Sequence, residues 1–356
     1  MNPNIQSSID LLQKLIAIPA KSREESARAD YLQNYLTNKS LDVHRVGNNL
    51  WCYAWPPEEG KPNLLLNSHI DTVPASDSWT RQPFEPQLEN GRLYGLGSND
   101  AGGPLCSLVA ASLSLREAYL QGKQQAYNLI LGLSCQEEIT GPEGVDLLLS
   151  DLPAIDLAVV GEPTSMRLAV AEKGLMVLDC TVYGESGHAA HATGDNAIYK
   201  AIKDIQWFQQ TQLPRVSPLL GPVKMTVSII NAGSKHNIIP DTCQFTVDVR
   251  VNECYQNQEL CEYIQSQVDC QVKARSYRLS SSGIDLQHPL VQRCRKMNIE
   301  LFASPTLSDQ SRMSFPSVKI GPGDSLRSHT ADEYILLDEI AEAIELYIAM
   351  LDGLQF

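Results

Sequence analysis

The chain has 356 residues, of which 43% are hydrophobic and 20% charged, so it can bury a sizeable core and is long enough for more than one domain. Its 28 basic and 42 acidic residues give a formal net charge of −14, and an anionic surface repels phosphate backbones and anionic lipids. We therefore expect neither nucleic acid nor a membrane surface among its partners.

The cysteines and the N-terminal segment indicate where the protein works. Nine cysteines are scattered along the chain and no Cys-x-x-Cys pair occurs, which argues against a disulfide framework and against a zinc ribbon. Asp10 and Lys14 interrupt the apolar N-terminal stretch, as in an amphipathic helix and unlike a signal peptide. No apolar run is long enough to cross a bilayer. These features favour a reducing compartment and a cytoplasmic location.

The first half of the chain alternates between two kinds of apolar periodicity. Apolar residues at helical spacing predict helices at 5–17, 24–37, 103–119 and 143–149. Short apolar runs predict strands at 50–55, 63–69, 127–135 and 156–160. Strands that alternate with helices are typical of an α/β fold, here a mixed sheet flanked by helices.

A second pattern begins near residue 175 and ends near residue 285. It reads as strand pairs with two helices, which is typical of a small α+β domain. After it the chain returns to α/β character, and Thr330 with Glu333 fits the capping box of a final helix. We therefore expect a discontinuous domain of residues 1–174 and 286–356, interrupted by an inserted domain of residues 175–285.

Side chains of the kinds that bind metal ions follow the predicted strands or lie between them. They are His69, Asp71, Asp100, Glu137, Glu138 and Glu162. In open α/β sheets, sites form in the crevice beyond the carboxyl ends of the strands, so these side chains should converge. Imidazole and carboxylate ligands without thiolates suit zinc, cobalt or manganese.

Spacing within each strand end suggests separate tasks. His69 and Asp71 are two residues apart, so in extended chain they lie on one side, and Asp71 can accept a hydrogen bond from the imidazole N–H opposite the metal. Glu137 and Glu138 are adjacent and point in different directions, so that one can bind metal while the other holds a water molecule for attack. Two such neighbouring charges are costly unless a cation offsets them.

These motifs give the chain a family resemblance over nearly its whole length. It resembles the zinc-dependent family that includes acetylornithine deacetylase, succinyl-diaminopimelate desuccinylase, aminoacylase and carboxypeptidase G, whose larger domain has a zinc-exopeptidase-like fold. The resemblance rests on HIDTVP (69–74), Asp100, Glu137-Glu138, GEP (161–163), GESGHAA (184–190), GSKHNIIP (233–240) and SHTADEY (328–334). Family members commonly read Asp-x-Lys-Gly at the shared aspartate, whereas this chain reads Asp100-Ala101-Gly102-Gly103.

The resemblance implies two zinc ions, for which cobalt or manganese can substitute. His69, Asp100 and Glu162 would hold one ion, and Asp100, Glu138 and His329 would hold the other, so that Asp100 bridges the two. Paired metals of this kind acidify a shared water molecule and polarise a carbonyl group.

The resemblance also implies roles for residues that bind no metal. Glu137 would act as general base and then as general acid, beside Asp71 as partner of the histidine ligand. His188 would stabilise the oxyanion, reaching into the site of a partner subunit, so we expect a homodimer formed through residues 175–285. Arg250 would clamp the substrate α-carboxylate, with a polar contact from Asn237.

The predicted function is removal of an N-acyl group, acetyl or succinyl, from a small amino acid, with N-acylornithine of arginine biosynthesis favoured. Succinyl-diaminopimelate desuccinylase and a dipeptidase or carboxypeptidase are rivals with the same chemistry. A catalytically silent relative that binds a metabolite or a partner is a rival of another class.

Each residue also has a simpler reading that the sequence leaves open. Asp100 in its glycine-rich segment could be a turn former, and His329 could merely precede a helix. His188 could be a loop histidine, and Arg250 a solvated arginine on the polar face of its strand. Ser308 and Asp309 are weaker candidates for lining a pocket.

Overall fold

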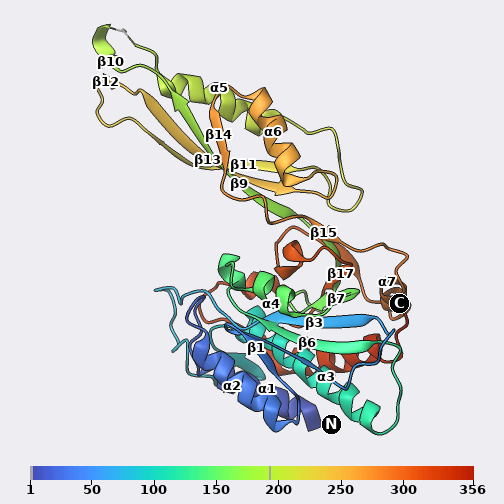
Figure 1. Ribbon diagram of the computed structural model, residues 1–356. Coiled ribbons are helices and arrows are strands. Elements are labelled where there is room, and N and C mark those ends of the chain that lie inside the picture. Colours follow the sequence, from blue (N-terminus) through green and yellow to red (C-terminus); the bar gives the residue numbers. More distant parts are fainter. Residues whose placement is uncertain (1–2, 192–193) are drawn as a thin grey trace. The chain divides into compact units, whose positions relative to one another are not determined.

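The structure is a computed structural model that describes residues 3–191 and 194–356, and these form two compact units (Figure 1). The main unit comprises Met1–Val170, Gly283–Phe302 and Ser308–Phe356, and the inserted unit comprises Ala171–Ser282 and Ala303–Leu307. The expected boundaries at 174/175 and 285/286 thus differ by a few residues from the observed boundaries, which follow Val170 and Ser282. The sequence did not indicate that the short segment Ala303–Leu307 packs with the inserted unit.

A mixed sheet forms the centre of the main unit. Its strands, in hydrogen-bonding order, are β1 (His44–Val46), β2 (Asn49–Tyr53), β6 (Asn128–Ser134), β3 (Asn63–His69), β7 (Leu157–Val160), β17 (Ser317–Lys319), β8 (Leu168–Glu172) and β15 (Ser282–Gly283), with β16 (Leu301–Ser304) paired to β8. β6, β3, β7 and β17 run parallel. β6 is buried along its whole length and β3 nearly so, as expected of parallel strands covered on both faces.

Helices cover this sheet because their apolar side chains have no other place to be buried. They are α1 (Pro3–Ile16), α2 (Ser26–Asn38), α3 (Gly103–Leu120), α4 (Val145–Asp151), α7 (Pro289–Lys296) and α8 (Leu337–Leu351). α3 is buried over most of its N-terminal two thirds because it packs between α1 and α8. Leu12, Leu108 and Ile344 belong to the large core that results.

A small antiparallel sheet of β4 (Gln87–Glu89), β5 (Arg92–Tyr94) and β18 (Tyr334–Leu336) ties the C-terminal part of the main unit to its first half. Tyr334 pairs with Tyr94 and Leu336 with Arg92. This pairing holds the segment before α8 beside the segment before α3.

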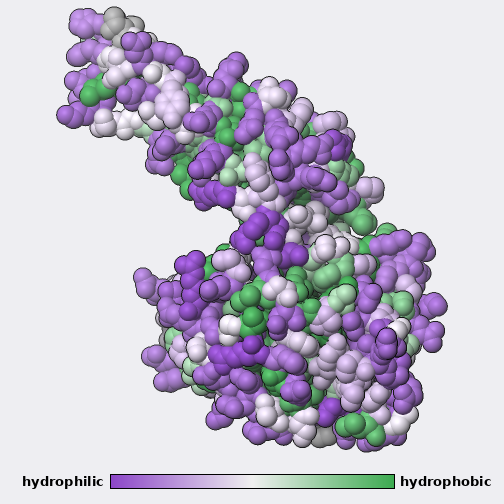
Figure 2. Space-filling model, in the orientation of Figure 1, coloured by the Kyte–Doolittle hydropathy of each residue, from purple (hydrophilic) through white to green (hydrophobic). Residues whose placement is uncertain are grey.

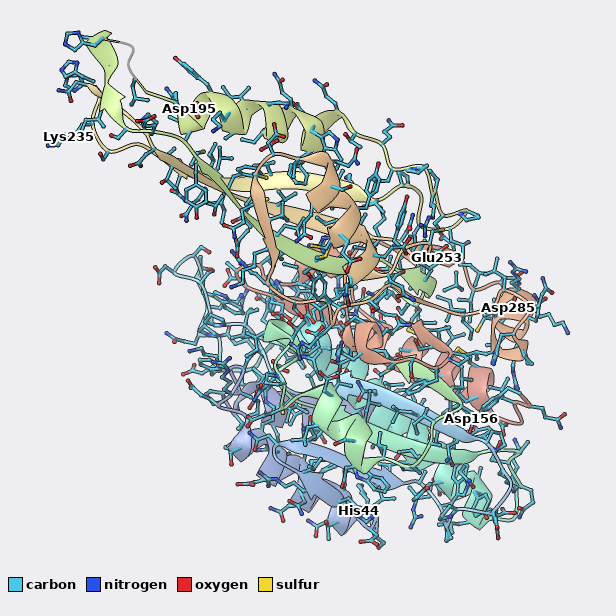
Figure 3. The ribbon with its side chains drawn as sticks, turned by 45° about the horizontal axis from the view of Figure 1, so that its top comes forward. His44, Asp156, Asp195, Lys235, Glu253 and Asp285 are labelled. Carbon is cyan, nitrogen blue, oxygen red and sulfur yellow. The ribbon has the colours of Figure 1, made fainter. Side chains whose placement is uncertain are left out.

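The inserted unit is a separate α+β structure with its own core. Its sheet has the order β11 (Lys224–Ala232), β13 (Thr242–Val251), β9 (Gly174–Tyr183) and β14 (Gln271–Ala274), covered by α5 (Ala197–Gln210) and α6 (Asn257–Gln267). A short ribbon of β10 (Gly187–His188) and β12 (Ile238–Ile239) lies at one end of the unit, where Figure 3 labels the neighbouring Asp195 and Lys235.

The elements expected from periodicity are confirmed, with one exception. All eight helices and strands predicted in the first half occur within two residues or so of the expected bounds. The helix expected after Thr330 is wrong: His329 and Asp332 have φ of 58° and 55°, outside the right-handed helical region, and α8 begins only at Leu337. The cap belongs to Glu339 instead, which accepts a hydrogen bond from the Leu336 N–H at 3.0 Å.

The visible surface is mostly hydrophilic (Figure 2). Figure 2 shows hydrophilic side chains over most of the visible face, with smaller hydrophobic patches between them. Among the described residues, no helix combines the length and the apolar character that crossing a bilayer requires.

Candidate metal centre and active site

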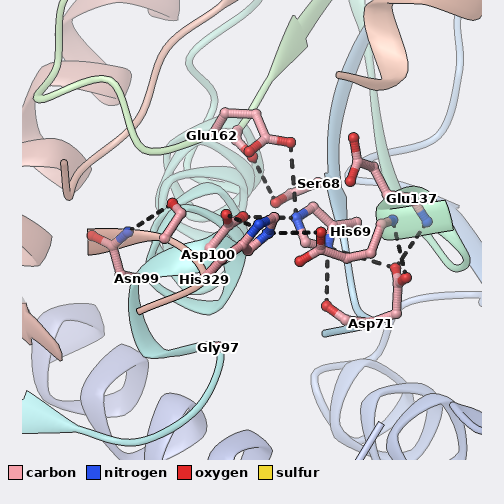
Figure 4. A network of polar contacts seen from close by, with 12 residues as sticks. Ser68, His69, Asp71, Gly97, Asn99, Asp100, Glu137, Glu162 and His329 are labelled. Carbon is pink, nitrogen blue, oxygen red and sulfur yellow. Dashed lines mark hydrogen bonds and ion pairs between the residues drawn. The ribbon is translucent and has the colours of Figure 1, made fainter. Parts of the chain in front are cut away.

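Three adjacent parallel strands end at the same edge of the main sheet and deliver ligand-type side chains there (Figure 4). His69 is the last residue of β3 and pairs with Ser134, the last residue of β6. Glu137 and Glu138 follow β6 in a short 3-10 turn, and Glu162 follows β7. The convergence that the strand ends predicted is therefore present.

The first group consists of His69, Asp100 and Glu162. The His69 Nε2 atom lies 3.1 Å from Asp100 Oδ1 and 3.8 Å from Glu162 Oε1. Burial of His69 works against its cation, but the carboxylates of Asp100 and Asp71 outweigh this and raise its pKa well above the ordinary value.

The second group consists of Asp100, Glu138 and His329. The His329 Nε2 atom lies 2.9 Å from Glu138 Oε2 and 3.7 Å from Asp100 Oδ2. Asp100 thus turns one carboxylate oxygen toward each group. His329 reaches this position in a left-handed backbone conformation, a strain that is typical of functional sites.

The donor set fits a pair of divalent cations. Ligands held at about 2.1 Å from one ion can be no more than roughly 4.2 Å apart. The four contacts of 2.9 to 3.8 Å satisfy this limit. Burial, with the nearby charge of Asp100, raises the pKa of Glu162 to about 8, and a cation would offset that cost.

Asp71 fixes the backbone of the glutamate pair as well as the histidine. Its carboxylate accepts hydrogen bonds from the Glu137 N–H at 3.0 Å and the Glu138 N–H at 3.2 Å. The His69 Nδ1 atom lies 3.0 Å from the carbonyl oxygen of Asp71 and 3.6 Å from its carboxylate. The spacing predicted the contact with His69; it gave no sign of the two backbone hydrogen bonds.

Glu333 holds the segment that carries Asp100, a function that the sequence did not reveal. Its side chain is buried and accepts the N–H groups of Gly97 at 3.0 Å, Asn99 at 2.7 Å and Asp100 at 2.9 Å. Burial, helped by the charge of Asp100, raises the pKa of Glu333 to about 8, while these N–H donors act in the opposite direction. A carboxylate that orients a metal ligand is a common feature of metal sites.

The backbone around Asp100 needs glycine at two places. Gly97 has φ of 74°, and a Cβ there would lie 2.5 Å from the side chain of Thr72. A Cβ on Gly102 would lie 2.3 Å from the carbonyl oxygen of Gly97 and 2.7 Å from Leu12. Gly102 occupies the position at which the resembling family commonly has lysine, so this chain has no room for that side chain.

Glu137 belongs to neither ligand group and faces a small pocket instead. The pocket is also lined by Asp309 and Ser308. Asp309 accepts hydrogen bonds from Asn67 at 2.8 Å and Ser134 at 2.5 Å. Burial raises the pKa of Asp309 to about 6 and that of Glu137 well above its ordinary value, because few charges there compensate these carboxylates.

Two of the residues expected to act from the inserted unit lie together. β10 pairs with β12 so that His188 is opposite Ile238, and the Ala189 N–H donates to the carbonyl oxygen of Asn237 at 3.1 Å. His188 is exposed, and its ring lies 5.2 Å from that of His191. The ribbon therefore presents both segments at one end of this unit.

Arg250 lies on β13 in a groove of the inserted unit. It forms a two-pronged contact with Asp248, at 2.8 and 3.1 Å. The groove has a volume of about 660 Å³ and is also lined by Lys173 and Lys224. Arg250 is about one-third exposed, so it is neither isolated nor fully solvated.

Comparison with known proteins assigns the chain to a family. Residues 65–353 match the model of peptidase family M20/M25/M40, so the chain belongs to this family of metal-dependent hydrolases. A peptidase M20 domain-containing protein of Schizosaccharomyces pombe is 28% identical over 96% of this chain and 83% of its own length. Succinyl-diaminopimelate desuccinylase 2 of a Ruegeria species is 25% identical over 74% of this chain and 70% of its own length.

A solved structure supports the fold. A dinuclear metal binding peptidase of the M20 family from Bacillus subtilis superposes with a TM-score of 0.73 at 15% identity, covering 98% of both chains. The expected fold class, a mixed sheet flanked by helices in a zinc-exopeptidase-like domain, is thereby confirmed. The enzyme class expected from the sequence, a metallopeptidase-family hydrolase, is confirmed as well.

Proposed function

We propose that the protein is a two-zinc amidohydrolase that removes an acyl group from the nitrogen of a small amino acid. The observation that carries this proposal is the pair of ligand groups that share Asp100, with Glu137 beside them and outside both. Two zinc ions bound there would polarise the scissile carbonyl group and lower the pKa of a water molecule.

The side chains of the chain itself would then divide the remaining work. Glu137 takes the proton of the attacking water and passes it to the departing amine, because its carboxylate is free of the ligand groups and its backbone is fixed by Asp71. His188 donates to the oxyanion of the tetrahedral intermediate, and Arg250 binds the α-carboxylate, with Asn237 as a further polar contact.

Several amino acids and acyl groups are compatible with this chemistry. N-acylornithine of arginine biosynthesis is the substrate that the sequence motifs favour. The relatives named succinyl-diaminopimelate desuccinylase favour succinyl-diaminopimelate instead, a substrate of lysine biosynthesis. A cytoplasmic dipeptidase or carboxypeptidase remains the third candidate.

A substrate panel distinguishes these candidates. Purified protein loaded with zinc or with cobalt would be given N-acetyl- and N-succinyl-ornithine, N-succinyl-diaminopimelate, and di- and tripeptides, and release of the primary amine would be measured. We expect cleavage of at least one acylated amino acid and little cleavage of peptides. Cleavage of peptides alone would overturn the proposal.

We further propose that the protein forms a homodimer through the inserted unit. β11 is an edge strand of its sheet, and among the described residues no strand pairs with its outer side. Ile229 and Ile230 on this strand are 50% and 54% exposed. A free apolar edge can pair antiparallel with the same edge of a second copy, which satisfies a two-fold axis.

The dimer leads to a prediction for Ile230→Lys. A lysine on this edge should block edge pairing and shift the sedimentation coefficient from that of a dimer to that of a monomer. If His188 acts in the site of the partner subunit, activity should fall together with the dimer. Tyr263→Lys is the matched control, because Tyr263 is 41% exposed on α6 of the same unit. A fully active Ile230→Lys monomer would contradict the action of His188 in the partner's site.

A further inference from the structure

A hollow in the main unit opens directly beside the second ligand group. It has a volume of about 410 Å³ and is lined by Glu138, by Lys21, Ser22, Arg23 and Glu24 of the loop between α1 and α2, and by Val73, Pro74 and Ile139. We call it the Arg23 hollow. Glu138 of the second ligand group is one of its lining residues, so a substrate bound at that group would lie next to the hollow.

Arg23 is the cationic residue of this hollow whose charge is left for a ligand. Among the described residues, no side chain forms a hydrogen bond or an ion pair with its guanidinium group. Lys21 lies 3.6 Å from Glu24, and both side chains are more than half exposed, so this pair is weak. Glu138 is already engaged by His329 at 2.9 Å. The hollow therefore offers a free planar donor of the kind that binds carboxylates.

The loop that carries Arg23 is fixed to the metal-binding segments. The Ser22 hydroxyl donates to the Asp71 carboxylate at 2.7 Å, and the Thr72 N–H donates to the Ala20 carbonyl oxygen at 2.9 Å. Asp71 is the same residue that holds the glutamate pair. The position of Arg23 is thereby coupled to the position of the ligands.

Arg23 itself is held in a conformation that arginine rarely adopts. Its φ is 77°, in the left-handed region, a conformation that persists only where the surroundings enforce it. Its N–H donates to the buried carboxylate of Glu25 at 2.7 Å, and Glu25 also accepts the Gln136 N–H at 3.2 Å. Glu25 thus ties this backbone to the residue that precedes Glu137.

The walls of the hollow are apolar, and Arg23 adds a positive charge that no carboxylate of the described residues pairs with. Val73, Pro74 and Ile139 present hydrocarbon surface, and Ile139 is 44% exposed although it adjoins a metal ligand. A ligand that matches both features has a short aliphatic segment and a terminal carboxylate.

We propose that the Arg23 hollow is the subsite for the distal carboxylate of the acyl group, which makes a dicarboxylic acyl group such as succinyl the preferred one. This inference rests on the proposed function and deepens it. Arg23 is then a residue that determines acyl specificity. An acetyl group leaves the subsite empty.

The test compares N-succinyl and N-acetyl derivatives of one and the same amino acid with Arg23→Gln. Because a hydrogen bond to a charged group is at stake, KM for the succinyl substrate should rise about tenfold, while kcat/KM for the acetyl substrate stays within about twofold. Arg23→Lys should recover part of the loss. Lys296→Gln is the matched control, as it removes an exposed cation on α7.

Direct binding separates this inference from the proposed function. In the Glu137→Gln variant, the dissociation constant of the N-succinyl amino acid is measured by calorimetry with and without Arg23→Gln. A weakening of about tenfold supports the subsite even if the unaltered enzyme hydrolyses none of the acylated amino acids, in which case the proposed function alone fails. An equal effect on the acetyl and succinyl compounds would mean that Arg23 binds the α-carboxylate and would overturn the inference, as would no effect on either.

Discussion

Replacing Glu137 with glutamine is expected to lower kcat by about 10²- to 10⁴-fold while both metal ions stay bound. Glutamine keeps the shape of the side chain but cannot take a proton from water, and general acid–base catalysis contributes a factor of this size. Glu137 lies outside both ligand groups, so metal content should not change. Steady-state kinetics, together with metal analysis of the purified variant, measures both quantities.

Glu117→Gln provides the control for charge, because Glu117 is exposed on α3 and its removal changes the net charge equally. It should behave like the unaltered enzyme. Near-normal kcat in Glu137→Gln would show that another group moves the proton, and Asp309 in the same pocket would be the next residue to replace. Loss of metal from Glu137→Gln would instead show that Glu137 is a ligand.

The sequence predicted the ligand groups because parallel strands impose a simple geometry. β6, β3 and β7 are neighbours that run in one direction, so residues immediately after their ends meet at one edge of the sheet. Short apolar runs locate such strands to within a residue or two. His69, Glu138 and Glu162 therefore come together from segments that the apolar pattern of the sequence locates.

The supporting residues could not be predicted in the same way, because their partners lie far away in the sequence. Glu333 is 236 residues from Gly97, whose N–H it accepts, and its spacing from Thr330 suggested a local cap instead. Glu25 lies 111 residues from Gln136 and reads as an ordinary polar residue at a helix start. Acidic residues next to an apolar stripe have a plausible local role, and that role conceals the long-range one.

Arg250 of the inserted unit could be predicted in part: its face of the strand followed from the sequence, but its neighbours did not. The alternation of apolar residues in β13 correctly put Arg250 on the face opposite the core, but it could not show the contact with Asp248 or the neighbouring Lys173 and Lys224. Those lysines come from β11 and from the segment before β9. Only the strand order brings them together.

The buried carboxylate of Glu333 leads to the second large expected effect. In Glu333→Gln, one of the two acceptor oxygens is replaced by an NH₂ group, which confronts a backbone N–H of the segment that carries Asp100. The free energy of unfolding should fall by about 1–3 kcal/mol, as expected when a buried donor loses its acceptor. Because Asp100 belongs to both ligand groups, its displacement should weaken metal binding by up to about 100-fold. Chelator competition measures the metal affinity, and denaturant unfolding of the metal-free protein measures the stability.

Glu342→Gln is the matched control, since Glu342 is an exposed residue of α8 a few residues further along the chain. The same chemical change there should alter neither quantity, because surface substitutions usually stay within about 0.5 kcal/mol. If Glu333→Gln lost stability but bound both ions with unchanged affinity, the hydrogen bonds to Gly97, Asn99 and Asp100 would be needed for folding alone. If instead metal binding weakened and stability did not change, the amide would have found its partners by rotating, and the shift of Asp100 would be the sole cause. The geometry requires that both stability and metal affinity fall in Glu333→Gln and that neither falls in Glu342→Gln.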